Sequence, residues 1–251
     1  MPEPATAAGP ATRPDGRGPD ELRPVEIEPG FVRSAHGSAL IAIGGTRVIC
    51  TASVVDGVPT WREASGGGWL TAEYSMLPAS TGKRKPRDSA RGRPDGRTVE
   101  IQRLIGRSLR AVADLDAFGQ RSLYVDCDVL EADGGTRCAA ITGGYVALEL
   151  ALQRLVEQGA LERLPLHGSV GAVSCGLVEG VALLDLCYKE DFAAEVDMNV
   201  VMTGEGELVE VQATAEEVPF SRASLDELLG LAAKGIGDLG AAQRAAVAAA
   251  V

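Results

Sequence analysis

Residues 122–131, SLYVDCDVLE, alternate apolar and polar side chains, and a long apolar stretch follows shortly after them at residues 139–155. Leu123, Val125 and Cys127 share one face with Val129, while the other face carries Tyr124 and two aspartates. Alternation with period two predicts a β-strand with one buried face, and the stretch that follows predicts a helix. Between them lies a turn with two adjacent glycines, ADGGTR, at residues 132–137. The fold must therefore join strand to helix through this turn.

The rest of the chain predicts three hairpins, one more strand and two more helices. The hairpins cover residues 38–54, 168–191 and 197–216, with glycines at each turn. A further strand is predicted at residues 68–77, an amphipathic helix at 98–115, and a long final helix from Ser221 or Ser224 as its cap. This order of elements predicts an α+β fold in which mixed sheets pack on helices.

Apolar and basic side chains occupy different faces of the predicted helix 98–115. The apolar set, at helical spacing, should face the core and comprises Ile101, Leu104, Ile105, Leu109 and Val112. Arg103, Arg107 and Arg110 share another face. That face is either simply solvated or extends the basic segment that precedes it.

Charge is distributed unevenly along the chain. The formal net charge is −11, which in bulk disfavours nucleic-acid binding, yet residues 83–110 hold ten basic and three acidic residues. A positive region on an acidic body suits a polyanion, although a solvated charged loop has the same composition. Residues 83–96 are almost free of apolar side chains and predict a long mobile loop, and loops of that length within a domain usually have a function.

Composition limits the class of protein. The chain has 251 residues, 45% of them hydrophobic, which is enough for a sizeable core. No apolar run is long enough to cross a membrane, and residues 1–12 predict a flexible tail without the apolar core of a signal peptide, so we expect a cytoplasmic protein. The five cysteines form no CxxC pair and are expected to be reduced core thiols. With only two histidines, neither in a suitable context, a Ser-His-Asp hydrolase or a zinc site is not expected.

The turn at residues 132–137 is a candidate anion site. Unpaired N–H groups at a helix start attract anions, glycine permits close approach, and Thr136 and Arg137 add side-chain donors. The spacing GxxxxGK(S/T) of a P-loop is absent. A single inorganic phosphate or a backbone phosphate therefore suits this turn better than a nucleoside triphosphate, and a plain structural cap is the alternative.

Two sets of carboxylates are candidate metal ligands. Asp191 and Asp197 flank a predicted turn between strands and could hold Mg²⁺ or Mn²⁺, or one could act as a general acid toward a leaving hydroxyl. Solvated loop acids are the alternative. Asp126 and Asp128, on one strand face, could also bind metal, but acids in this setting are more often hydrogen-bonded structural groups.

Several long motifs in one order closely resemble the bacterial ribonuclease PH family. They include RPDGRGPDELRPVEIEPGF, GWLTAEYSMLPAST, GRTVEIQRLIGRSLRAV, DCDVLEADGGTR, ITGGYVAL and AAEVDMNVVMT. The resemblance runs from about Arg13 to the final helix and implies one domain, residues 13–251, with the ribosomal protein S5 domain 2-like α+β fold. It also implies a phosphorolytic 3′→5′ exoribonuclease that trims tRNA precursors and can also act on rRNA 3′ ends. Inorganic phosphate would be the co-substrate and nucleoside 5′-diphosphates the products. The reverse reaction would extend RNA 3′ ends, and the assembly would be a homohexamer, a trimer of dimers.

The resemblance also assigns roles to individual residues. Phosphate binding falls on Arg97, Gly135, Thr136 and Arg137, and metal-assisted catalysis on Asp191 and Asp197. RNA guidance falls on the basic loop, where we select Arg84, Arg87 and Arg91. Cys138 and Glu131 depart from the residues frequent in the family but remove no expected ligand. The competing hypotheses are a non-catalytic RNA-binding ring subunit and a metal-dependent hydrolytic nuclease.

Overall fold

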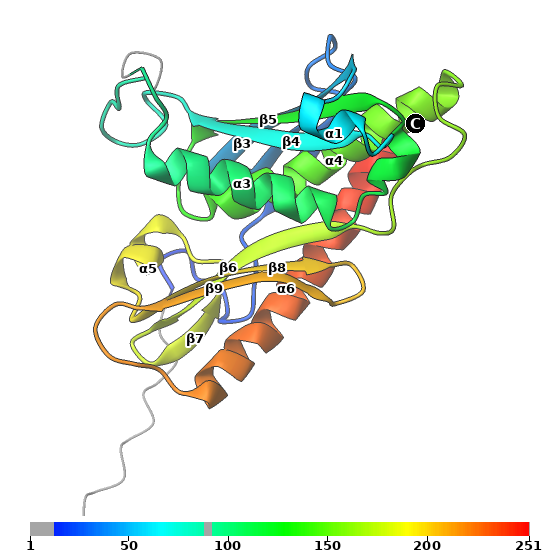
Figure 1. The fold of residues 1–251 in the computed structure, drawn as a ribbon. Coiled ribbons are helices and arrows are strands. Elements are labelled where there is room, and N and C mark those ends of the chain that lie inside the picture. The colour runs from blue at the N-terminus through cyan, green and yellow to red at the C-terminus, as the bar shows by residue number, and fades with distance from the viewer. Residues whose placement is uncertain (1–12, 88–91, 251) are drawn as a thin grey trace, which may run out of the picture.

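The first of two β-sheets is mixed and is built from the N-terminal half of the chain (Figure 1). The computed structural model describes residues 13–87 and 92–250. The strand order is β1-β2-β3-β5-β4, with bounds β1 Val25–Pro29, β2 Gly37–Ile43, β3 Thr46–Asp56, β4 Trp69–Met76 and β5 Arg121–Glu131. The predicted first hairpin is confirmed, because Ile43 pairs with Thr46 across the Gly44–Gly45 turn. Only β4 and β5 are parallel, since helix α3 (Gly96–Arg110) connects them as a crossover.

Two helices cover one face of the first sheet. Helix α3 packs on β4, and α4 (Thr136–Glu157) packs on β2, β3 and β5. The alternation in β5 is confirmed, because Leu123, Val125 and Cys127 are buried while Tyr124 is exposed. Helix α4 is buried on all sides along most of its length, since the second sheet and the final helix pack on its other side. This explains why its sequence is apolar without a polar face.

The second sheet is antiparallel throughout, with order β7-β6-β8-β9. Its strands are β6 Val170–Val178, β7 Val181–Leu184, β8 Val196–Thr203 and β9 Leu208–Ala215. The two predicted hairpins are confirmed, and their short turns leave no length for a parallel crossover. The first is shorter than predicted, because β7 ends at Leu184 and a helix, Tyr188–Ala193, replaces the expected strand end and turn before Asp197. The mixed pairing predicted from the sequence therefore applies to the first sheet only. The other helices are α1 Thr60–Glu63, η1 Leu115–Phe118, α5 Tyr188–Ala193 and α6 Arg222–Ala250.

Helix boundaries follow side-chain caps. The Asp95 carboxylate accepts from the Thr98 N–H at 2.7 Å, so α3 begins two residues before the predicted start and ends at Arg110. The predicted core face of this helix is confirmed, because its apolar set is buried. Of the two predicted caps for α6, the structure selects Ser221, whose hydroxyl accepts from the Ser224 N–H at 3.1 Å.

Other sequence predictions can be placed on the fold. All five cysteines are buried free thiols, as expected. Within residues 13–87 and 92–250, no helix has the length and apolar character needed to cross a bilayer. The predicted N-terminal tail, residues 1–12, lies outside the described residues, as does Arg91 in the basic loop. The described parts of that loop, at residues 83–87 and 92–95, contain no helix or strand.

Candidate active site

The turn between β5 and α4 presents the start of a helix to a pocket. Gly135 caps α4 with φ of 67°, a left-handed conformation that favours glycine, and Thr136 is the first helical residue. The Tyr74 hydroxyl donates to Thr136 Oγ1 at 2.9 Å in a buried contact. Because Thr136 Oγ1 accepts in this contact, its own hydroxyl hydrogen stays available to donate to another acceptor. Burial raises the pKa of Tyr74, so this phenol stays protonated as a donor.

Arg137 is held in place by two other elements. Its Nη1 donates to Gln212 Oε1 on β9 at 2.7 Å and to Glu100 Oε1 on α3 at 3.3 Å. Within the described residues these contacts use only one of its nitrogens, so Nε and Nη2 are available to an anion. Tyr74, Glu100 and Gln212 were not identified from the sequence. Only Tyr74 offered a signal, as a polar-tipped ring on the buried face of a predicted strand.

A pocket of about 790 Å³ joins the turn to the basic loop and α5. Its lining residues are Met76, Thr81, Gly82, Lys83, Lys85, Arg97, Ala132, Gly134, Gly135, Thr136, Tyr188 and Asp191. Arg97, from the first turn of α3, thus lines the same pocket as Gly135, Thr136 and Asp191, whereas Arg137 and Asp197 are not among its lining residues. Lys83 and Lys85 also reach the pocket, although they were not selected individually within the basic loop.

The RNA-binding candidates lie outside the pocket lining. Arg84 and Arg87 are exposed on the loop beside it. Arg87 lies close enough to Asp128 to oppose the rise in the pKa of that carboxyl. The basic loop therefore extends from the pocket toward Asp128 on β5.

Asp191 and Asp197 lie together on the acidic side of the site. Burial raises the pKa of Asp197 to about 6, and the nearby Asp191 carboxylate adds to this rise. Desolvation also raises the pKa of Asp191, although its carboxylate still faces water in the pocket. Arg97 and Arg137 lower the pKa of both carboxyls. All four charged groups therefore belong to one site.

The two carboxylates fit a divalent cation. Asp197 Oδ1 is buried and has no hydrogen-bond partner among the described residues. No donor therefore replaces the water that this oxygen loses on burial, as buried acceptors normally require. Hard cations prefer such oxygens, and Mg²⁺ typically uses one or two carboxylates with water and substrate phosphate oxygens. Within the described part of the chain, no three His, Cys, Asp or Glu side chains form a ready-made metal cluster. The donor set thus suits a cation that substrate helps to bind.

The other acidic pair lies elsewhere. Asp126 and Asp128 project from the face of β5 opposite to the buried residues that contact α4. Burial raises the pKa of Asp126, and Glu73 and Asp128 raise it further. Neither acid is among the residues that line the pocket.

Comparisons with known proteins agree on one group. The model of the 3′ exoribonuclease family, domain 1, matches residues 21–152, and that of domain 2 matches residues 168–235. Ribonuclease PH of Syntrophomonas wolfei is 55% identical over 232 residues, which cover 92% of this chain and 97% of that protein.

Solved structures share the fold. Rice Rrp46 aligns with a TM-score of 0.76 at 20% identity, covering 94% of this chain and all of that chain. A subunit of the Archaeoglobus fulgidus exosome with RNA bound to the active site aligns with a TM-score of 0.76 at 24% identity, covering 90% and 91% of the two chains. The first family model spans the first sheet and most of α4, whereas the second spans the second sheet and the first half of α6.

Proposed function

The chain belongs to the 3′ exoribonuclease family that includes ribonuclease PH, and from this premise we propose how its pocket performs phosphorolysis. Inorganic phosphate binds at the start of α4 and attacks the last phosphodiester of an RNA. The 3′ nucleotide leaves as a nucleoside 5′-diphosphate, and the reverse reaction extends the RNA. The observation that carries this proposal is the meeting of Arg97, the α4 turn and Asp191 around one pocket.

The cationic side brings two anions together. Phosphate and an RNA phosphodiester repel each other, so their encounter requires fixed positive charge. The α4 N-terminus, Arg97 and Arg137 supply that charge, and Arg137 is already oriented by Gln212 and Glu100. Because Arg137 and the α4 N-terminus are held in place before substrate arrives, these donors need little reorganisation during the reaction.

The acidic side serves the leaving group. Asp191 and Asp197 would hold Mg²⁺ or Mn²⁺, which when bound neutralises charge on the leaving 3′ oxygen. The alternative role needs no cation on Asp197: its raised pKa, at about 6, lets the metal-free carboxyl carry a proton at mildly acidic pH and deliver it to that oxygen.

The basic loop guides the RNA. Arg84 and Arg87 are exposed beside the pocket, and Lys83 and Lys85 line it, so positive charge continues from the reaction centre outward. Such contacts follow the backbone and read no sequence. Precursors of tRNA, and rRNA 3′ ends, are the proposed substrates, in which a folded RNA body stops digestion by steric exclusion.

We further propose a cytoplasmic homohexamer. Its support is the fold shared with subunits of solved structures described as an archaeal exosome core, one of which aligns with a TM-score of 0.74 at 23% identity. Sedimentation velocity tests this assembly: a single species of six times the mass of the 26.0 kDa chain is expected, whereas a stable monomer would contradict it.

One assay separates phosphorolysis from its rivals. The protein is incubated with a tRNA bearing a short 3′ extension and Mg²⁺, with and without inorganic phosphate. Phosphate-dependent release of nucleoside diphosphates is expected. Monophosphates formed without phosphate would indicate a hydrolytic nuclease, and retention of intact RNA without products would indicate a binding subunit.

A further inference from the structure

We propose that Arg23 and Thr46 are positioning residues that set the distance between the phosphate turn and the acidic helix α5. The phosphate turn comprises residues 133–135, and the α5 entry loop comprises residues 185–187. The proposal rests on the proposed function, because it assigns these two residues the task of keeping the phosphate donors opposite Asp191. The Arg23 guanidinium and the Thr46 hydroxyl are both engaged by groups of the protein itself, so we assign them a positioning role and no direct contact with substrate.

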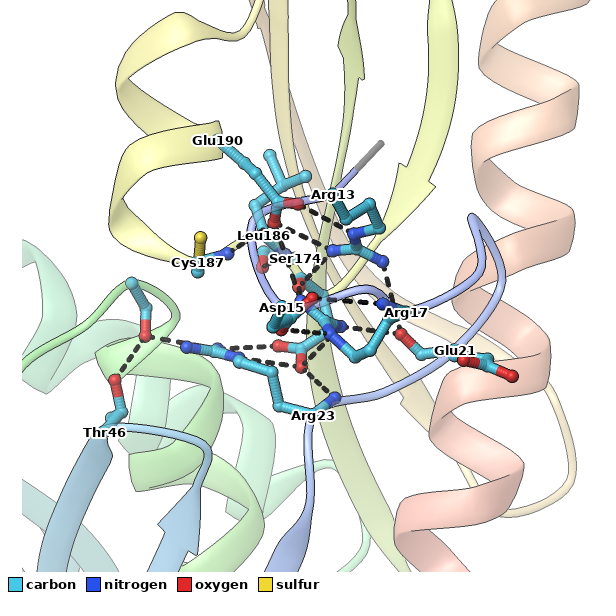
Figure 2. Close-up of polar contacts among 12 residues, drawn as sticks. Arg13, Asp15, Arg17, Glu21, Arg23, Thr46, Ser174, Leu186, Cys187 and Glu190 are labelled. Carbon is cyan, nitrogen blue, oxygen red and sulfur yellow. Dashed lines mark hydrogen bonds and ion pairs between the residues drawn. The ribbon is translucent and has the colours of Figure 1, made fainter. Parts of the chain in front are cut away.

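Arg23 connects the two segments directly. Its Nε and Nη2 donate to the two carboxylate oxygens of Asp185 at 2.9 and 2.7 Å, and its backbone N–H donates to the same carboxylate at 2.8 Å. Its Nη1 donates to the Asp133 carbonyl, and its Nη2 lies 3.5 Å from the Gly134 carbonyl. The side chain of Arg23 is only 3% exposed. One buried guanidinium thus uses its fork to hold both segments (Figure 2).

The α5 entry loop is fixed on its own side. The Asp185 carbonyl accepts from Arg13 Nη2 at 2.9 Å and from Arg17 Nη2 at 3.1 Å, and Asp185 itself has φ of 53°. Arg13 also makes a bidentate pair with Glu190, at 2.7 and 2.8 Å. Glu190 precedes Asp191 and accepts from the Cys187 N–H at 2.9 Å, as Figure 2 shows. The position of Asp185 therefore determines where α5 begins.

Thr46 supports the phosphate turn from the opposite side. Its hydroxyl donates to the Gly134 carbonyl at 2.6 Å and accepts from the Asp133 N–H at 2.9 Å, and the residue is fully buried. Thr46 and Arg23 together therefore satisfy three part-buried backbone groups of the turn, namely the Asp133 N–H and the carbonyls of Asp133 and Gly134.

The turn and the loop are in backbone contact. A Cβ added at Gly134 would lie 2.6 Å from the Leu186 carbonyl oxygen, and the Tyr188 N–H donates to Asp133 Oδ1 at 3.3 Å. The turn lies in the segment matched by the first family model, while Asp185 and α5 lie in the segment matched by the second. Arg23 therefore connects the two halves of the site where they touch.

Arg23→Lys tests the guanidinium fork. Lysine keeps the buried positive charge beside Asp185 but cannot reach the carboxylate and both turn carbonyls together. We expect the KM for phosphate to rise about tenfold and kcat to fall, since misplacement by about 1 Å can cost up to roughly 100-fold. The Kd for RNA measured without phosphate should not change. The control is Arg62→Lys. Arg62 likewise donates to a backbone carbonyl, that of Gly68, and to a carboxylate, that of Asp116, but neither partner lines the pocket.

If Arg23→Lys does not fold, the variants Thr46→Val and Thr46→Ser test the positioning role instead. Thr46→Val preserves shape but removes the hydroxyl, and we expect the same rise in the KM for phosphate. Thr46→Ser restores the hydroxyl and should restore the KM. An unchanged KM in Thr46→Val, with only a lower melting temperature like that of Arg62→Lys, would overturn the positioning role. Wild-type protein without phosphate-saturable activity would instead refute the proposed function itself.

Discussion

Arg137 illustrates how a single side chain is prepared by partners that are distant in the sequence. Its Nη1 contacts Glu100 and Gln212, which come from two different elements. Only 16% of the side chain is exposed, and its charge lowers the pKa of both Asp191 and Asp197, so the guanidinium is largely shielded from bulk solvent beside these carboxyls. An arginine held in this way loses little rotamer entropy when it binds phosphate.

Replacing Arg137 with alanine should separate phosphate use from RNA retention. The variant removes donors aimed at the attacking phosphate, so phosphorolysis should slow by roughly 100-fold to 1,000-fold. Steady-state rates against phosphate concentration check this, and filter binding of tRNA should show little change. Arg163→Ala is the matched control, since Arg163 is largely exposed and pairs with Asp114 outside the site. Loss of tRNA retention in Arg137→Ala would contradict the assigned role.

Asp197 should make stability depend on pH in a defined direction. Its pKa is raised from 3.8 to about 6 in the folded protein, chiefly by burial. Because the folded protein holds this proton more tightly than the unfolded chain, the protonated carboxyl contributes to the free energy of unfolding. This contribution is fully present below the unfolded-state pKa of 3.8 and is lost as the pH rises through about 6. In buffer free of divalent cations, Asp197→Asn should therefore match wild type near pH 3.8 and become the more stable protein above pH 6. Urea unfolding at several pH values measures this.

Adding Mg²⁺ supplies the control for that experiment. A cation bound by ionised Asp191 and Asp197 stabilises the wild type. It stabilises the Asp197→Asn variant less, because one of its two carboxylate ligands is missing there. The stability difference should therefore narrow at neutral pH. A stability difference between the two proteins that is the same at every pH, with or without Mg²⁺, would contradict both the raised pKa of Asp197 and its role as a metal ligand.

At the scale of elements, α4 depends on how closely it approaches the first sheet. A Cβ at Gly143 would lie 2.7 Å from Ile41 and 3.0 Å from Cys50, whereas a Cβ at Gly144 would meet nothing closer than 3.3 Å, at Val125. Both residues are buried in the middle of the helix. The two neighbouring glycines are therefore not equivalent.

Alanine substitutions at these two positions form a matched pair. Gly143→Ala should destabilise the protein by about 1–3 kcal/mol, because the added methyl group overpacks the interface with β2 and β3. Gly144→Ala should be near neutral, because the gain of roughly 1 kcal/mol in helix propensity offsets a milder contact. Chemical denaturation measures both, and equal destabilisation by the two would contradict the packing described for α4.

Local patterns predicted the long elements but missed strand β1 and the short helices α1 and α5, and they did not predict the contacts between elements. Hairpins could be predicted because alternation and turn glycines are properties of short stretches. Thr136 and Asp191 could be selected from the sequence, and the structure places both on one pocket. The groups that orient the site could not be predicted. Tyr74 and Thr136 are 62 positions apart, and Arg23 and Asp185 are 162 apart, so only the folded chain brings them together.

At the scale of the whole molecule, opposite charges are segregated. Residues 83–110 are strongly basic, although the chain carries a net charge of −11. The described part of this region borders the pocket through Lys83, Lys85 and Arg97. An acidic body with one basic region should direct RNA to the active site and repel it elsewhere.

The salt dependence of RNA binding tests this distribution. Arg84→Ala and Arg87→Ala should each weaken binding and reduce the slope of log K against log salt by about 1, because each removes one phosphate contact. Arg163→Ala is the control, since Arg163 is exposed and pairs with Asp114 outside the pocket lining. A slope unchanged in Arg84→Ala and Arg87→Ala but reduced in Arg163→Ala would place the RNA on a different face.

The central claim is that phosphate held at the start of α4 is the nucleophile. The most direct measurement follows ³²P-labelled inorganic phosphate through one round of digestion of unlabelled RNA. The label should appear as the terminal phosphate of the released nucleoside diphosphates in wild type and be greatly reduced in Arg137→Ala. Release of unlabelled nucleoside monophosphates by the wild-type protein would contradict the claim.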